Sequence, residues 1–312
     1  MVGYPFCVLL FFFGSLPCFL RKNINQFCVV CVWFVCIFYV LWIIIQKYQV
    51  ILKSKLLCPN DIISVIGGYM GSYAKRNSKY VITAILIVAL FAVQFLFSRL
   101  GFLISQLFDY SSLDPDGLFM QVSVHHIIQM LCALALIFII RKVRKTEGFK
   151  LRPRLDSRGI KYTLLFCLAI TVYYLAIYII GSFTNTINTY DYELNAVNVS
   201  GTLGFQLLLS GPSEEILFRS LPIAVLLSVL DPGSKKDRAI AVISAAALFG
   251  ISHIDLFTFR ISWFQVGYAF VLGIFYGYTF IRSKSVLYPM IMHSMSNVIS
   301  VGGCYLYMVL FK

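Results

Sequence analysis

Charged residues are scarce in this chain, and acidic residues are scarcer than basic ones. Only 12% of the 312 residues are charged, whereas 60% are hydrophobic. An ordinary soluble domain has about 25% charged residues, because it must cover its core with polar surface. The composition therefore excludes a typical soluble protein and indicates a bundle of membrane-spanning helices.

The charges that are present are mostly positive. There are 13 acidic residues against 26 lysines and arginines, which gives a net charge of +13. In a soluble protein this excess would suggest a nucleic acid as partner, but no RNA- or DNA-binding motif accompanies it. The basic residues instead lie in short segments between apolar runs, as in cytoplasmic loops that face anionic lipid. We therefore expect membrane lipid as a partner and no nucleic acid.

Residue patterns typical of structural metal sites are also lacking. Cys28 and Cys31 have the spacing of a zinc or redox site, yet no second pair and no nearby histidine completes it. The contiguous His-Glu-x-x-His motif of common zinc proteases is absent as well. We interpret the nine cysteines as small apolar residues of membrane helices and predict no disulfide.

Long apolar runs dominate what remains. A helix needs about 20 apolar residues to cross a bilayer. The candidate segments are 27–46, 80–98, 118–140, 162–181, 203–230, 239–258, 263–281 and 286–309. We predict an all-α protein, a polytopic membrane bundle of about eight transmembrane helices with the active site inside the bundle. We expect residues 1–79 to form N-terminal membrane segments and residues 80–312 to form the bundle.

The loop charges predict how the helices cross the membrane. The loop 141–161 holds nine lysines and arginines, whereas the loop 182–202 holds two acidic residues and no basic one. Because basic loops remain in the cytoplasm, we place the first loop inside and the second outside. From residue 80 onward the alternation is consistent, which predicts a multi-pass protein of the cell membrane.

Two glutamates and an arginine lie inside the apolar segment 203–230. A charged group at bilayer depth is expensive, so it usually faces a cavity or a partner. Glu215 and Arg219 are four residues apart and should pair on one helix face. Glu214, rotated by about 100° from Glu215, should remain available as a general base. Pro212 lacks an N–H and should loosen the helix just before the glutamates.

Two later apolar segments supply histidines. Phe249 and His253 are four residues apart, as are His293 and Asn297, so each pair should share a helix face. Two imidazoles and a carboxamide that converge on Glu214 could activate a water molecule and stabilise the oxyanion of an amide under attack. Glu214, His253 and His293 could alternatively hold a divalent metal such as zinc. The sequence does not decide between these mechanisms.

The other two histidines, His125 and His126, are neighbours in the segment 118–140. Gln121 and Gln129 lie at helical spacing from them, and neutral amides can satisfy His125 by hydrogen bonding. We therefore interpret this pair as structural or interfacial rather than as part of the site.

Three motifs follow one another along the last apolar segments: Glu-Glu-x-x-x-Arg at 214–219, Phe-x-x-x-His at 249–253 and His-x-x-x-Asn at 293–297. This ordered set resembles the CPBP family of intramembrane proteases. The family includes the eukaryotic CAAX prenyl endopeptidases and bacterial proteins linked to bacteriocin processing and self-immunity. The resemblance implies a protease core at about residues 160–312, and the N-terminal half shows no motif of the family.

The resemblance also implies a role for each motif residue. Four would be catalytic: Glu214, His253, His293 and Asn297. Glu214 would activate the water with His253 as its partner, and the other two would stabilise the oxyanion. Three would support them: Glu215, Arg219 and Phe249. Whether the reaction needs a metal is left open by the resemblance.

His253 is followed by Ile254, Asp255 and Leu256, without the further histidines of the eukaryotic converting enzymes. This difference implies a bacterial member of the family in the plasma membrane. We hypothesise an intramembrane endopeptidase that cleaves a hydrophobic, lipidated or signalling peptide. The alternative is a non-catalytic membrane scaffold or bacteriocin-immunity protein that binds another membrane protein. A proton-coupled transporter ranks last, because it would need paired broken helices in symmetric halves.

Overall fold

The computed structural model describes the backbone of residues 64–144, 148–184, 186–254 and 261–311. These described residues form helices and no strand, so the predicted all-α fold is confirmed for this part of the chain. The predicted span 27–46 lies outside the described residues, as does the rest of the N-terminal segment up to residue 63.

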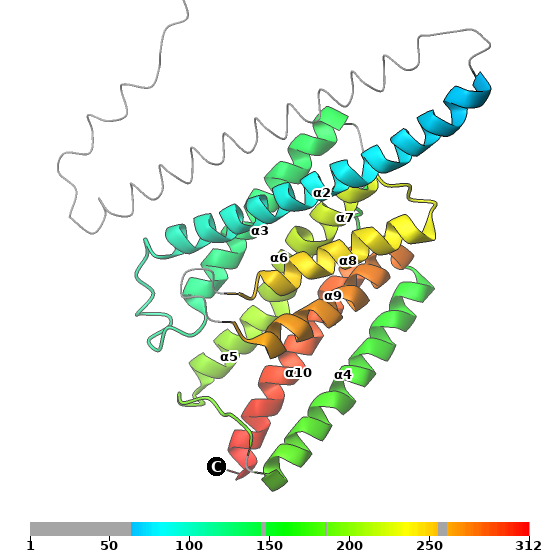
Figure 1. Cartoon of the computed structure of the whole chain (residues 1–312). Coiled ribbons are helices and arrows are strands. Elements are labelled where there is room, and N and C mark those ends of the chain that lie inside the picture. Colours follow the sequence, from blue (N-terminus) through cyan, green and yellow to red (C-terminus); the bar gives the residue numbers. More distant parts are fainter. Residues whose placement is uncertain (1–63, 145–147, 185, 255–260, 312) are drawn as a thin grey trace, which may run out of the picture. The chain divides into compact units, whose positions relative to one another are not determined.

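Seven helices form the described part of the chain when α5 to α7 are counted as one run. They are α2 Ser64–Ser105, α3 Met120–Arg144, α4 Ser157–Thr184, the run Ala196–Leu227, α8 Lys235–Ile251, α9 Trp263–Ser283 and α10 Leu287–Phe311 (Figure 1). Five are long and apolar enough to cross a membrane: α2 from Ser78 onward, α3 up to Val143, α4, α9 and α10. The protein is therefore a multi-pass membrane protein. The predicted number of about eight spans is not confirmed.

The helices pack as neighbours that are mostly close in the sequence. α2 pairs with α3, α8 pairs with α9, and α4 lies against α9 and α10 (Figure 1). The run Ala196–Leu227 lies among them and contacts α2, α3, α8, α9 and α10. The acidic motif is thus carried by a helix that other helices surround.

The basic loop 141–161 and the acidic loop 182–202 lie at opposite ends of this bundle. Val286, between α9 and α10, donates its N–H to the carbonyl of Lys150 in the basic loop over 3.1 Å. At the other end of α3, Asn198 Nδ2 donates to Asp116 Oδ2 over 2.7 Å. This separation fits the predicted placement of basic loops inside and acidic loops outside.

Two π-helical turns interrupt the run that carries the glutamates. Its parts are α5 Ala196–Phe205, η1 Gln206–Ser210, α6 Gly211–Glu215, η2 Ile216–Ser220 and α7 Leu221–Leu227. Pro212 follows the first π turn and Pro222 follows the second. A proline cannot donate the i→i−4 bond and its ring crowds that carbonyl, so the wider π turn accommodates it. The loosening predicted before Glu214 is confirmed.

The second π turn leaves a backbone carbonyl free, and another helix satisfies it. The N–H of Leu221 bonds to Ile216, five residues earlier, instead of to Leu217. Gln94 Nε2 of α2 donates to the carbonyl of Leu217 over 3.1 Å. Irregular backbone at membrane depth persists where protein supplies such partners. This bond ties α2 to the helix of the acidic motif.

Close packing at a glycine sets the distance between α6 and α10. A Cβ atom at Gly211 would lie 2.7 Å from the carbonyl oxygen of Met290 and would also collide with the hydroxyl of Ser294. Because glycine has no Cβ, the two backbones can approach closely here. The glutamates of α6 therefore lie beside the side chains of α10.

Candidate active site

A fully buried ion pair lies at the centre of the acidic motif. Glu215 Oε2 and Arg219 Nε are 3.1 Å apart, and neither side chain is exposed. The guanidinium also lies over the ring of Phe249 at 4.1 Å and near that of Tyr276 at 5.1 Å. Aromatic faces attract a cation, so the rings stabilise a charge that water does not reach. The predicted pairing of Glu215 with Arg219 is confirmed.

His293 of α10 joins the two glutamates. Its Nδ1 lies 2.8 Å from Glu215 Oε1, and its Nε2 lies 3.7 Å from Glu214 Oε2. A carboxylate only accepts hydrogen bonds, so Nδ1 carries the proton and Nε2 faces Glu214. The ring of Tyr276 stacks on the imidazole at 5.2 Å. Glu215 and Tyr276 together fix the orientation of His293.

Glu214 is the partly exposed member of the acidic pair. Its side chain is 17% exposed, whereas that of Glu215 is completely buried. Besides His293, the carboxylate approaches His126 of α3, whose Nδ1 lies 3.8 Å from Glu214 Oε1. Glu214 therefore borders open space between two imidazoles, which suits the predicted general base.

His253 lies in a turn beyond the end of its helix. α8 ends at Ile251, whereas the sequence predicts a helix to residue 258. The side chains of Ser252 and His253 both bond to the carbonyl of Phe249, over 2.7 and 2.8 Å. The N–H of His253 turns to Gly250 instead, so the α-helix does not continue. Phe249 and His253 nevertheless remain in contact, as predicted, with their rings edge to face at 4.9 Å.

Asn297 extends the site along α10. Its Nδ2 donates to Oγ of Ser210, the last residue of the first π turn, over 2.9 Å. A pocket of about 320 Å³ lies between this turn, α9 and α10. All four predicted catalytic residues line it: Glu214, His253, His293 and Asn297. The structure thus brings together side chains that are up to 83 positions apart in the sequence.

Residues 197–299 match the family model described as type II CAAX prenyl endopeptidase Rce1-like. These residues are an Rce1-like domain. The Rce1-like domain contains all seven motif residues and confirms the resemblance to the family of CAAX endopeptidases. It implies a CAAX-type protease, and the apolar helices place that protease in a membrane. No curated protein and no solved structure matches the chain.

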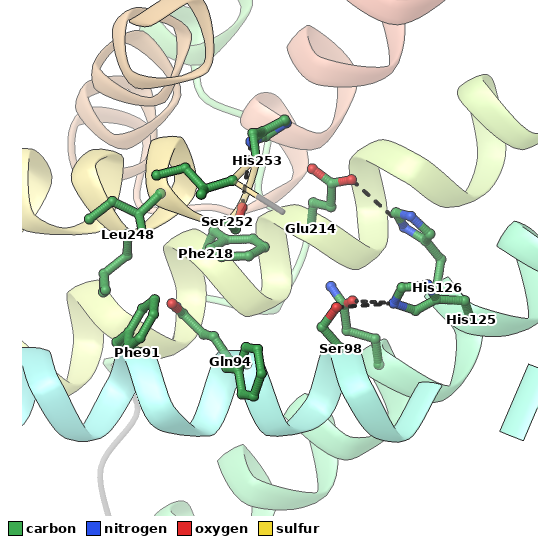
Figure 2. A pocket seen from close by; sticks show the side chains of 14 residues that line it. Phe91, Gln94, Ser98, His125, His126, Glu214, Phe218, Leu248, Ser252 and His253 are labelled. Atoms are coloured by element: carbon green, nitrogen blue, oxygen red, sulfur yellow. Dashed lines mark hydrogen bonds and ion pairs between the residues drawn. The ribbon is translucent and has the colours of Figure 1, made fainter. Parts of the chain in front are cut away.

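A second pocket, of about 280 Å³, lies where the Rce1-like domain meets α2 and α3. It shares Glu214, His126 and His253 with the first pocket. Figure 2 shows the side chains of Glu214 and His126 pointing toward one another across it. Glu214 therefore stands at the junction of two pockets.

His126 belongs to the site, which corrects the interpretation of His125 and His126 as structural. Its Nδ1 lies 2.7 Å from Ser213 Oγ, beside Glu214. His125 behaves as predicted, because its Nε2 lies 3.1 Å from Gln129 Oε1. The sequence signal for His126 was its position at bilayer depth, where an ionisable side chain usually marks a functional site.

The possible metal ligands of the Rce1-like domain do not form a grouped set. Among the described residues, no group of three or more histidine, cysteine, aspartate or glutamate side chains is arranged to hold one. Glu214, His253 and His293 line one pocket, but they are not grouped as a set of ligands. The mechanism proposed below therefore contains no step through a metal, and elemental analysis of the purified protein tests that choice.

Proposed function

We propose that this protein is an intramembrane endopeptidase that hydrolyses a peptide bond in a hydrophobic or lipidated substrate. The observation that carries the proposal is the convergence of the predicted catalytic side chains on one pocket of a membrane-spanning bundle. The Rce1-like domain supports the same class of reaction.

Glu214 acts as the general base in this proposal. It takes a proton from water, and the water oxygen attacks the carbonyl carbon of the scissile bond. His253 donates a hydrogen bond from its Nδ1–H to the carbonyl of Phe249, so its unprotonated Nε2 can accept a hydrogen bond from that water. When the tetrahedral intermediate collapses, the C–N bond breaks and Glu214 returns the proton to the leaving nitrogen. The products are a new carboxylic acid, which ionises to the carboxylate, and a free amine.

Asn297 stabilises the oxyanion, and His293 can do so once its Nε2 shares the proton that Glu214 takes from the water. Asn297 Nδ2 carries two N–H groups, of which one bonds to Ser210, so the second can reach the developing charge. His293 Nε2 faces Glu214 and can share the proton that Glu214 takes from the water. Walls of packed helices keep bulk water away and strengthen these interactions.

An apolar groove supports a substrate with a hydrocarbon chain. The groove, of about 920 Å³, lies between α4 and α9. It shares Tyr268 and Leu272 with the catalytic pocket, the one that Glu214, His253, His293 and Asn297 line. At this border, Tyr268 Oη lies 3.0 Å from Tyr174 Oη. Burial of hydrocarbon contributes about 0.8 kcal/mol per CH₂ group. A lipidated or strongly apolar peptide therefore fits beside the polar site.

The test is hydrolysis by the full chain purified in detergent. The protein is incubated in H₂¹⁸O with a library of apolar and lipidated peptides, and mass spectrometry identifies the products. We expect internal cleavage with one ¹⁸O atom in the new carboxylate. A folded protein that cleaves no peptide would contradict the proposal and favour a scaffold or immunity protein.

A further inference from the structure

The second pocket, between α2, α3 and α8, has no role in the mechanism described so far. An endopeptidase must hold its substrate on both sides of the scissile bond to keep that bond in place for attack. The two pockets meet at Glu214, the residue proposed to act on that bond (Figure 2). Two adjoining pockets therefore match the two halves of a bound peptide.

The direction of the peptide follows from the positions of the polar groups. Asn297 and His293 border only the pocket between α9 and α10, so the oxyanion belongs there. Glu214 Oε1 faces His126, which borders both pockets. The leaving nitrogen must receive its proton from Glu214, so the chain on the carboxyl side of the bond extends into the second pocket.

The lining of the second pocket suits an uncharged, apolar side chain. Phe91 of α2, Phe218 of η2 and Leu248 of α8 form an apolar wall. Glu214 is its only acidic residue, and no lysine or arginine lines it among the described residues. An acidic substrate side chain would lose its hydration here without gaining a lysine or arginine as partner, and a basic one could pair only with Glu214, which the proposed reaction needs free.

Gln94 supplies a second, independent observation. Its side chain is only 3% exposed, and its Oε1 has no hydrogen-bond partner among the described residues. Its Nε2 is already used by the carbonyl of Leu217, which fixes the amide in place. A buried acceptor without a partner is costly, and a peptide N–H can satisfy it. Gln94 lines the second pocket, where such an N–H would arrive.

We propose that the second pocket binds the substrate residue on the carboxyl side of the scissile bond, and that α2 and α3 set its specificity. This inference rests on the proposed endopeptidase function. The pocket selects an uncharged apolar side chain, and Gln94 accepts the N–H of the following residue. Both helices lie outside the Rce1-like domain, so the reaction and the choice of substrate reside in different parts of the chain.

The experiment compares two variants that change the pocket in opposite directions. Phe91→Ala enlarges it, and Ser98→Leu narrows it. Each full-length variant is assayed in detergent against peptides that differ in the residue on either side of the cut. We expect Phe91→Ala to raise kcat/KM for Trp relative to Val on the carboxyl side by about tenfold, and Ser98→Leu to lower it. Preferences on the amino side should not change.

Phe138→Ala is the matched control, because Phe138 lies on α3 with 67% exposure and does not line the pocket. It should leave both preferences unchanged. In the wild type, an ester in place of the first amide after the scissile bond removes the N–H offered to Gln94 and should lower kcat/KM about tenfold.

Unchanged carboxyl-side preferences in both variants, or a shift on the amino side instead, would overturn the inference. An ester substrate cleaved as fast as the amide would remove Gln94 from it. These results would leave the proposed function intact as long as the wild type hydrolyses peptides. A folded wild type that cleaves no peptide would instead contradict the proposed function itself.

Discussion

Glu215 Oε1 lies 2.8 Å from Nδ1 of His293, so the glutamate that pairs with Arg219 also holds the histidine that faces Glu214. Two adjacent carboxylates thus have different tasks. Glu215 is buried and builds the site, whereas Glu214 borders the pockets and is proposed to react.

Glu215→Gln should mainly reduce stability. It leaves the buried guanidinium of Arg219 without a counter-charge, and breaking a buried pair costs about 3–5 kcal/mol. Chemical unfolding in detergent measures this loss. Glu214→Gln is the matched control, because Glu214 is partly exposed and does not pair with Arg219. Its loss of unfolding free energy should stay below about 1 kcal/mol. Equal losses of unfolding free energy in the two variants would contradict the division of tasks between Glu214 and Glu215.

Gly211→Ala should separate α6 from α10. The new methyl group would collide with the carbonyl of Met290 and the hydroxyl of Ser294, and overpacking of this kind costs about 1–3 kcal/mol. We also expect a lower kcat, because the shift moves the glutamates away from His293. Gly204→Ala is the matched control. It makes the same substitution in α5 of the same helical run, Ala196–Leu227, where nothing lies within 4 Å of the added atom. Its unfolding free energy should equal or exceed that of the wild type, and similar losses in both would refute the packing argument.

Asn297→Ala should lower kcat and leave KM nearly unchanged. Loss of one oxyanion donor typically reduces kcat by about 10²–10³. Steady-state kinetics on the best peptide measures both constants. Ser210→Ala, which removes only the neighbour of the amide, should cost less than about tenfold in kcat. A raised KM with an unchanged kcat would mean that Asn297 binds the substrate instead of the transition state.

Metal removal should leave activity unchanged. No group of described side chains is arranged to hold a metal ion, so in the proposed reaction Glu214 activates the water without one. Elemental analysis of the purified protein and assays with chelator measure this directly. One zinc per chain, lost together with activity and restored by added zinc, would contradict the metal-free mechanism.

Contacts within one helix could be predicted from the sequence. Glu215 and Arg219 pair because four residues make about one helical turn. Pro212 indicated the loosened turn in the same way, because a missing N–H acts locally. The ordered motifs also identified every side chain of the catalytic pocket that the mechanism uses.

Contacts between helices could not be predicted in this way. His126 reaches Glu214 and Gln94 reaches Leu217 only because α2 and α3 pack against the run Ala196–Leu227. Periodicity does not specify which helices become neighbours. The end of α8 was also mispredicted, because the side chain of His253 competes for a backbone carbonyl that a longer helix would use.

The most direct test of the central claim is the kcat of Glu214→Gln against that of the wild type. Both are purified in detergent, shown to unfold at the same temperature, and assayed on the same peptide. Because glutamine cannot take a proton from water, we predict that kcat falls by about 10²–10⁴. Equal rates of hydrolysis by the two proteins would contradict the assignment of Glu214 as the general base.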